Sequence, residues 1–505
     1  MAANIPGYYY DPEKRRYFKI ENSRTAPSNA AWSSENVKKR RLEDEAAAAA
    51  LRRMNLNKNR IARSKALSEP LMGGFFAREY GDVDRDVPAA CFAKGMLEKG
   101  QMLLGDARWG KSSNVKRMYI SGQDTKTGLG TAYATLDELT LISTYIPRDK
   151  NGRVHRRLLA EYVTPRNQIA PYQEMAIPQI SDIKYHEGTN QMLITSRKPG
   201  SEVSMWAFTP KVTEPDDRRP HWLLGRNGVE MYTNVRTAGS GPFHDYQANC
   251  VAPAPAGSPS VCVVGTNRGL THWDSGTGHM KWLTTPAAAT ATAAQQQLGN
   301  NPFRDVFALD FPSPSDPNAL LFGGRPGRLH AADLRVPGVR WRELLRLPGP
   351  LTHVVGGDHG NGNGHRVLVA ALHSHLAVYD LRFLRSNDDG DGYRENAKTP
   401  VVAFPRYRNR ARVDVGLAVA VDAASGGLVA AAHDDGTVAL YSPRTGRRLR
   451  CAALDSDSGS ENSRDVVRAL QFQTFPGDAT PTLFVGRGSS ICAYSFGVEG
   501  LGDEA

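Results

Sequence analysis

From Cys91 onward, the sequence is a series of short apolar stretches separated by clusters of Gly, Pro, Asn and Asp. In Val261–Trp273, an apolar strand, a turn closed by a glycine and a second strand ending in an aromatic residue follow one another. Leu428–Tyr441 repeats this order. Even strand spacing with a repeated unit, and no long helical pattern, favours a β-propeller over a sandwich.

The repeats therefore predict an all-β domain, a WD40-type β-propeller of about seven blades. We expect it to span residues 91–498, with residues 499–505 as a flexible tail. Five polar or low-complexity insertions are expected on surface loops, because such compositions do not build a core. The predicted blades are centred on residues 114–148, 178–210, 245–285, 303–347, 350–405, 412–452 and 464–496, and the insertions are Pro253–Ser260, Ala287–Asn301, Gly356–Gly364, Ser386–Lys398 and Asp455–Ser463.

Two of these repeats end in the same way. Leu376–Arg382 reads Leu-Ala-Val-Tyr-Asp-Leu-Arg, and His330–Arg335 reads His-Ala-Ala-Asp-Leu-Arg, with Asp380 and Asp333 in the Asp-x-Arg position. The two arginines are 47 positions apart (382 − 335), close to the length of one blade. An arginine just after a strand stands at the rim, where its planar fork can meet carboxylates or carbonyls of a partner while the Asp braces the turn. The alternative is a purely structural turn arginine.

Composition separates a folded body from a basic N-terminal arm. The 505 residues are 40% hydrophobic and 23% charged, which indicates a globular protein with a sizeable core. The net charge is +11, of which residues 1–66 contribute +8 (15 Lys/Arg against 7 Asp/Glu). Such an arm suggests nuclear import or contact with acidic partners. The five cysteines form no Cys-x-x-Cys pair and no apolar run reaches 18 residues, so we expect an intracellular protein with no disulfide framework, zinc site or membrane span.

Residues 1–20 are predicted to form an aromatic hairpin. Two aromatic runs flank Asp11-Pro12-Glu13-Lys14, a sequence typical of a tight turn. A two-stranded hairpin is marginal in water by itself, so its aromatic side chains are expected to dock on something. Both this protein's own body and a partner remain open. The residues concerned are Tyr8, Tyr10, Tyr17 and Phe18.

Residues 21–90 are predicted to form a basic helix followed by a flexible linker. Ser33 or Ser34 is placed to cap a helix that runs to about Met54, because alanine and long charged side chains follow. The helix is either an exposed spacer or an element that docks in a partner's groove. Its basic run, Lys38, Lys39, Arg40 and Arg41, is a candidate nuclear localisation patch. We therefore expect a nuclear protein and leave a cytoplasmic pool open.

Three motifs suggest chemistry that their surroundings do not support. Gly105–Ser112 matches the P-loop pattern, but Ser113–Gly122 is more typical of a turn and a strand than of the helix a P-loop needs. Asn387–Lys398 resembles a calcium loop but ends in Lys398 where a bidentate Glu belongs. His373 and His375 lack a third ligand. We predict no catalytic residues, no cofactor and no metal, with a P-loop nucleotide-binding enzyme as the least favoured alternative.

In this order, the aromatic opening, the basic helix, the two Asp-x-Arg boxes and the C-terminal Leu483–Tyr494 resemble the WD-repeat substrate receptors of cullin-4 RING ubiquitin ligases. The likeness is close at Pro6–Phe18 and thin over the rest. It implies that the damage-specific DNA-binding adaptor of the ligase is bound by Arg335 and Arg382, braced by Asp333 and Asp380.

The resemblance has departures. Ala332 and Tyr379 occupy the Trp positions of the two boxes, and the next repeat has Ser442 in place of Asp, so Arg444 is not assigned. The resemblance implies a non-enzymatic substrate receptor with an unknown protein substrate. We do not expect a membrane partner, or nucleic acid as a direct specific ligand. The alternative is a general WD-repeat scaffold of a nuclear or RNA-associated complex.

Overall fold

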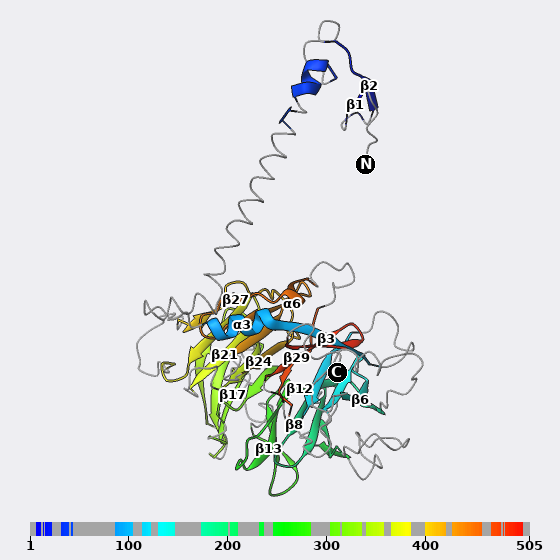
Figure 1. The fold of residues 1–505 in the computed structure, drawn as a ribbon. Helices are drawn as coiled ribbons and strands as arrows, with labels where there is room; N and C mark the ends of the chain where they lie inside the picture. Colours follow the sequence, from blue (N-terminus) through cyan, green and yellow to red (C-terminus); the bar gives the residue numbers. More distant parts are fainter. Residues whose placement is uncertain are drawn as a thin grey trace. The chain divides into compact units, whose positions relative to one another are not determined.

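The structure is a computed structural model, and its chain divides into two units, residues 1–84 and 85–505. Each unit is considered by itself (Figure 1). The described residues are 7–11, 14, 16–22, 32–39 and 42–43 in the first unit, and 86–104, 114–122, 130–146, 173–199, 203–210, 232–236, 246–283, 304–313, 316–335, 340–357, 365–384, 399–420, 427–456, 466–475, 478 and 480–497 in the second.

The second unit is a ring of seven antiparallel four-stranded sheets, which we call blades 1 to 7. Within blades 1 to 6 the strands pair in chain order. The first three blades are β4 (Arg117–Ser121), β5 (Gly130–Thr135), β6 (Thr140–Ile146) and β7 (Gln173–Ala176); β8 (Ile180–His186), β9 (Gln191–Ser196), β10 (Ser204–Phe208) and β11 (Tyr232–Arg236); and β12 (Ala248–Pro253), β13 (Ser260–Thr266), β14 (Leu270–Asp274) and β15 (Met280–Trp282).

The next three blades have the same layout. They are β16 (Val306–Asp310), β17 (Ala319–Gly324), β18 (Arg328–Asp333) and β19 (Arg340–Arg346); β20 (Leu351–Gly356), β21 (Arg366–Ala371), β22 (His375–Asp380) and β23 (Val402–Ala403); and β24 (Leu417–Ala420), β25 (Leu428–Ala432), β26 (Val438–Tyr441) and β27 (Arg448–Leu449). A short helix, α6 (Ala452–Ser456), follows blade 6.

Blade 7 closes the ring with strands from both ends of the unit. β28 (Leu470–Gln473), β29 (Thr482–Arg487) and β30 (Ser490–Phe496) are completed by β3 (Met96–Leu103), which pairs antiparallel with β30. In this sheet β30 lies between β29 and β3, so the light-blue β3 and the red C-terminal strands of Figure 1 belong to one blade. The helix before β3, α3 (Val87–Gly95), packs against the same blade through a stacked pair, Phe92 and Phe496, with ring centroids 5.5 Å apart.

The predicted fold class is confirmed: the domain is all-β and a seven-bladed propeller. Three outer strands lie outside the predicted blade limits. β7 and β11 follow long inserts after the third strands of blades 1 and 2, and β3 precedes the first predicted blade. The unit that holds the propeller begins at Arg85, so the predicted start at Cys91 lies inside α3.

The second strands of the blades explain why the repeats appear as continuous apolar runs. Every residue of β13 and β25 is buried, because both faces of such a strand are covered by neighbouring blades. Between blades 5 and 6, for example, Leu368 and Val378 share a buried cluster with Tyr441. All five cysteines are free, and burial raises the pKa of the Cys262 thiol to about 12, so it stays neutral.

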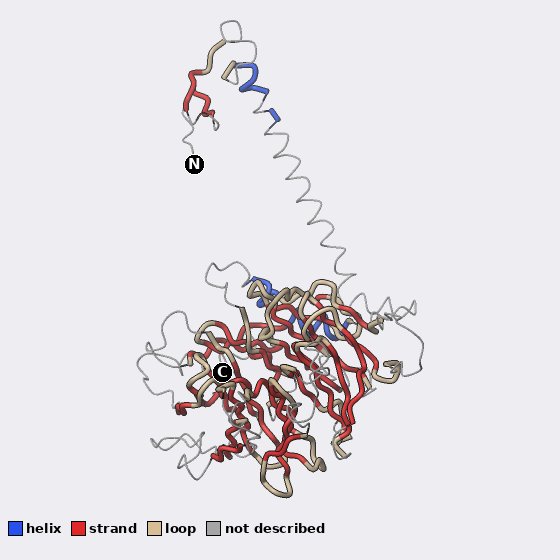
Figure 2. Tube along the Cα trace, turned by 180° about the vertical axis from the view of Figure 1, so that it is seen from behind, coloured by secondary structure: helices blue, strands red, loops and turns tan. Residues whose placement is uncertain are grey.

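The first unit contains the predicted hairpin. β1 (Tyr8–Asp11) pairs antiparallel with β2 (Arg16–Lys19), and the chain is helical at residues 34–39 and 42–43 (Figure 2). Phe18 stacks on Trp32 with ring centroids 4.7 Å apart. The Ser33 hydroxyl accepts a hydrogen bond from the Asn36 amide at 3.3 Å, so Ser33 is the cap. The remainder of the predicted helix lies outside the described residues.

Two of the motifs, Gly105–Ser112 and Asn387–Lys398, lie wholly outside the described residues. Downstream of the first, residues 114–116 are not helical and β4 begins at Arg117, in agreement with the predicted strand. No helix in the described part of the chain is long and apolar enough to span a membrane.

Candidate protein-interaction face at the third-strand ends

One turn recurs at the end of the third strand in blades 3, 4, 5 and 6. In each, a side-chain oxygen at or just after the strand end accepts a hydrogen bond from the backbone N–H two residues on, the Asx or Ser turn that Asp and Ser favour. The pairs are Asp274 with Gly276 at 2.9 Å, Asp333 with Arg335 at 3.0 Å, Asp380 with Arg382 at 3.0 Å and Ser442 with Arg444 at 3.3 Å. The predicted bracing of the turn by Asp is therefore present in blades 4 and 5.

Blades 4 and 5 add an arginine fork to this turn. Arg335 donates from Nε to Asp333 Oδ1 at 3.0 Å and from Nη2 to Oδ2 at 2.7 Å. Arg382 and Asp380 repeat the same two bonds at 3.0 and 2.7 Å. The sequence predicted that the arginines project toward a partner; the structure adds that one edge of each guanidinium turns back onto its own aspartate.

The outer edge of each fork stays accessible. A guanidinium has five N–H donors, and the fork to aspartate uses two of them. The Arg335 and Arg382 side chains are 65% and 49% exposed, whereas Asp380 is only 6% exposed. The fork therefore fixes the direction of the arginine and leaves three donors for another molecule.

The two carboxylates are held ionised by this pairing. The hydrogen bond from the Arg335 side chain lowers the pKa of Asp333 to about 2. The corresponding bond from Arg382 lowers the pKa of Asp380. The aspartates raise the pKa of their arginines in turn. Both pairs are therefore charged at neutral pH.

Blade 5 places an exposed aromatic beside its fork. Phe383 follows Arg382 directly and is 75% exposed. The Arg382 guanidinium carbon lies 5.6 Å from the centre of its ring, within cation–π range. Val401, whose amide donates to the Val378 carbonyl, is a second exposed apolar side chain of this blade. Charge and apolar surface therefore meet at one point of the face.

In blade 4, a tryptophan on the neighbouring strand β19 lies beside the position where the box lacks its Trp. Ala332 occupies that position and pairs across the sheet with Trp341, which is 44% exposed. The Trp341 ring meets His330 edge-on with ring centroids 5.2 Å apart, and His330 stacks on Phe322 at 5.1 Å. Burial lowers the pKa of His330 to about 4, so the imidazole is neutral.

In blade 5, Tyr379 fills the Trp position. Its hydroxyl lies 3.1 Å from His375 Nε2, and burial raises its pKa to about 12. Tyr441 of blade 6 repeats the arrangement with His433 at 2.9 Å. The tyrosines therefore anchor the strands from which the turns emerge, and His375 is used in this contact. Among the described residues, no group of three His, Cys, Asp or Glu side chains is arranged to hold a metal.

In blades 3 and 6, the Asp or Ser of this turn pairs with a side chain from outside the turn in place of the arginine. In blade 3, Gly276 stands in the arginine position, and Lys281 of β15 pairs with Asp274. In blade 6, the Ser442 hydroxyl donates to the buried carboxylate of Asp86, which also accepts from Thr445. Asp86 precedes α3 directly, so blade 6 uses a carboxylate from the far end of the unit.

The structure thus brings the four predicted residues, Asp333, Arg335, Asp380 and Arg382, to equivalent positions of adjacent blades. Sequence reasoning missed Phe383 and Trp341, since one exposed aromatic gives no pattern, and Asp86, because its partner is 356 positions away.

The other predicted residues belong to the first unit. There, Tyr8 and Tyr17 are exposed, while Phe18 packs internally on Trp32. The side chain of Tyr10 lies outside the described residues, as do Arg40 and Arg41; Lys38 and Lys39 are exposed.

Solved structures with a similar architecture include the crystal structure of a computationally designed protein, Ika8, and that of the WD40 β-propeller domain of Doa1. The first has a TM-score of 0.43 at 12% identity, covering 79% of this chain and 99% of that one. The second has a TM-score of 0.45 at 9% identity, covering 79% and 97%. No protein-family model and no curated protein sequence matches the chain. The chain is a WD40-like β-propeller, a fold that suits a protein-interaction scaffold or adaptor.

Proposed function

We propose that this propeller is a substrate receptor of a cullin-4 RING ubiquitin ligase and that blades 4 and 5 bind the damage-specific DNA-binding adaptor. The observation that carries the proposal is the same Asp–Arg fork, with the same bond lengths, at the same turn of two adjacent blades. The protein acts by positioning: this face binds the adaptor, the opposite face presents a substrate, and the ligase supplies the chemistry.

The composition of the face supports a protein partner. Arg and aromatic side chains dominate the few residues that supply most of the binding energy at interfaces. Arg382 and Phe383 place both kinds side by side in blade 5, and blade 4 carries the exposed Arg335 and the exposed Trp341. Preorganised forks also lose less side-chain entropy on binding than free arginines do. The partner that fits offers carboxylate or carbonyl acceptors around an apolar pocket.

The experiment is co-purification of the adaptor with a double charge reversal, Arg335→Glu with Arg382→Glu. Truncating one partner of a buried charge pair at an interface typically costs about 2–5 kcal/mol, and about 1.4 kcal/mol is tenfold in affinity. We expect the variant to lose the adaptor while its melting temperature stays near that of the parent.

The matched control reverses two other exposed arginines of blade 4, Arg325→Glu with Arg346→Glu, and should keep the adaptor. Adaptor binding retained by the Arg335/Arg382 variant would reject the receptor function at these residues, and co-purification of other nuclear proteins instead would favour the general scaffold. If the variant unfolds, a purely structural role of the two arginines in their turns is still possible. The neutral pair Arg335→Gln with Arg382→Gln then distinguishes adaptor binding from that structural role, because it removes the forks without adding charge repulsion.

A further inference from the structure

A basic loop lies at the end of β22 opposite to the turn that carries Arg382. The loop, residues 404–413, connects β23 of blade 5 to β24 of blade 6. Its Asn409 carbonyl accepts a hydrogen bond from the Ser374 amide at 2.6 Å, directly before β22 begins. The Asp380–Arg382 fork stands at the other end of β22. The loop therefore belongs to the propeller face opposite the candidate adaptor face.

Buried polar contacts fix the loop's shape. Asn409 is fully buried; its side-chain amide donates to the Arg412 carbonyl at 2.8 Å and its side-chain carbonyl accepts from the Arg412 amide at 3.0 Å. Tyr407 is 3% exposed and packs edge-on against His433 with ring centroids 5.8 Å apart. Asp434, in the neighbouring turn of blade 6, accepts from the Arg410 amide at 3.1 Å. The loop is thus pinned to two blades.

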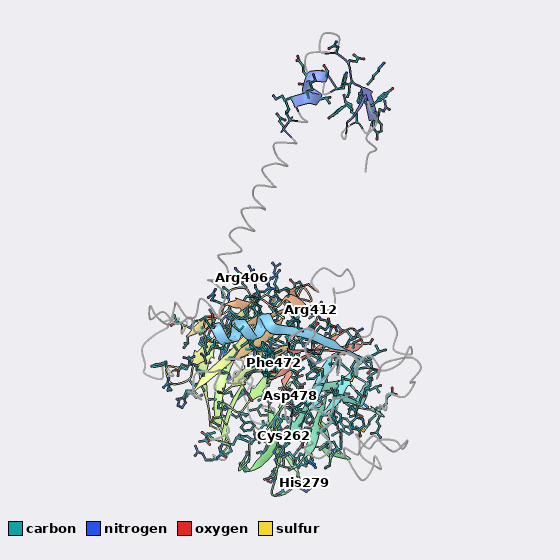
Figure 3. The ribbon with its side chains drawn as sticks, in the orientation of Figure 1. Cys262, His279, Arg406, Arg412, Phe472 and Asp478 are labelled. Atoms are coloured by element: carbon teal, nitrogen blue, oxygen red, sulfur yellow. The ribbon has the colours of Figure 1, made fainter. Side chains whose placement is uncertain are left out.

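This pinning displays four arginines in a row. Buried Tyr407 and Asn409 alternate with the exposed Arg406, Arg408 and Arg410. A bend at residues 410–411 follows, and the Asn409 side chain holds the backbone of the exposed Arg412. Arg408 pairs with Asp435 at 3.1 Å, whereas the other three form no ion pair with any described residue. Figure 3 labels the two outermost, Arg406 and Arg412, at the same end of the propeller. We call this row the arginine ridge, and its members are Arg406, Arg408, Arg410 and Arg412.

We propose that the arginine ridge binds an acidic peptide segment of a partner protein, with its carboxylates against the exposed guanidinium groups. Guanidinium groups match carboxylates geometrically, and three of the four have no ion pair with a described residue, so the ridge offers positive charge complementary to an acidic segment. The aromatic residues of the loop, Phe404 and Tyr407, are buried. The ridge therefore lacks the exposed stacking rings that single-stranded nucleic-acid sites use, which favours a peptide. The binding itself is independent of the adaptor; its assignment to the substrate rests on the proposed function.

The test is fluorescence anisotropy of the full chain with a labelled peptide of alternating glutamate and serine. We expect saturable binding that weakens with added salt. Arg406→Ser, Arg410→Ser and Arg412→Ser together should lower the affinity at least about tenfold, since several exposed ionic contacts are lost. The matched control removes three positive charges elsewhere on the propeller, Lys198→Ser, Arg342→Ser and Arg450→Ser, and should bind like the parent.

The outcomes separate this inference from the proposed function. Peptide binding should survive the Arg335→Glu with Arg382→Glu change, and adaptor binding should survive the ridge variant. No peptide binding, or equal loss in the control, overturns the ridge inference and leaves the receptor proposal intact. A labelled single-stranded DNA that binds more tightly than the peptide, and is lost in the ridge variant, overturns it in favour of nucleic acid.

Discussion

The Ser442 hydroxyl of blade 6 donates a hydrogen bond to the Asp86 carboxylate, across 356 positions of sequence. Asp86 is the residue before α3, yet its side chain makes no capping bond to that helix. It binds Ser442 and Thr445 instead, and only 3% of it is exposed. The contact fastens the segment that leads into the closing strand β3 to a blade that this strand does not join.

We predict that Asp86→Ala destabilises the propeller through this contact. Leaving two buried or part-buried hydroxyls without their acceptor typically costs about 1–3 kcal/mol. The measurement is the free energy of unfolding in denaturant, combined with Ser442→Ala in a double-mutant cycle. If the two changes are additive, the hydrogen bond contributes nothing to stability and the fastening role is wrong.

Phe383→Ala is expected to weaken adaptor binding without changing stability. The side chain is 75% exposed, so its removal leaves no cavity, while losing an interface aromatic commonly costs over about 1 kcal/mol. Titration calorimetry with purified adaptor should show affinity reduced about tenfold. Leu139→Ala, which removes another exposed apolar side chain from blade 1, is the control and should bind normally; an unaffected Phe383 variant excludes this residue from the interface.

His330 makes stability depend on pH. Burial lowers its folded pKa from 6.5 to about 4, so between these values the unfolded chain binds more protons than the folded one. Stability is therefore lost as pH falls from 6.5 toward 4, at up to about 1.4 kcal/mol per pH unit. His353 and His433, also lowered to about 4, act in the same direction.

Both ring nitrogens of His330 lack a hydrogen-bond partner among the described residues. His330→Phe should therefore keep the stacking on Phe322 and reduce the pH dependence. Unfolding free energies at several pH values between 4 and 7 give the slope for parent and variant. An unchanged slope would show that folding does not lower the pKa of this imidazole.

The basic arm is expected to direct nuclear entry. Residues 1–66 carry a charge balance of +8 (15 − 7), and Lys38 and Lys39 are exposed on the helical segment. Replacing Lys38, Lys39, Arg40 and Arg41 with Ala should move a fluorescent fusion toward the cytoplasm. The control replaces Arg52, Arg53, Lys58 and Arg60 with Ala, which removes the same charge, and should stay nuclear. If replacing the first four residues leaves the fusion nuclear, this patch is not the import signal.

The blades were predictable because a strand buried on both faces must be apolar along its whole length, as β25 is. The outer strands of the blades were harder to predict from the sequence. β3 reads Met-Leu-Glu-Lys-Gly-Gln-Met-Leu, with a register shift between Glu98 and Gly100, and nothing local indicates that its partner is β30. Long-range pairing of this kind is set by the closing ring and not by the strand itself.

The candidate site likewise combines features set by local sequence with features set by long-range contacts. The Asp-x-Arg spacing of blades 4 and 5 is a local pattern, and the turn it builds is local as well. Sequence reasoning did not single out the arginine ridge, because the order of its loop depends on the contact between Asn409 and Ser374, 35 positions apart. Tertiary contacts therefore turned an ordinary basic loop into an ordered surface.

The composition of blade 7 has a consequence for biosynthesis. β3 is translated before any blade, and its neighbours β28 to β30 come last, 367 positions later (470 − 103). At about 5–20 residues per second the ribosome needs roughly 20–70 s to bridge that interval, during which the emerging ring keeps an open edge. Nascent chains that stall before Ser490 cannot pair β3 and expose unsatisfied strand edges. An unfinished propeller therefore differs from a finished one in this open edge, which only the pairing of β30 with β3 closes.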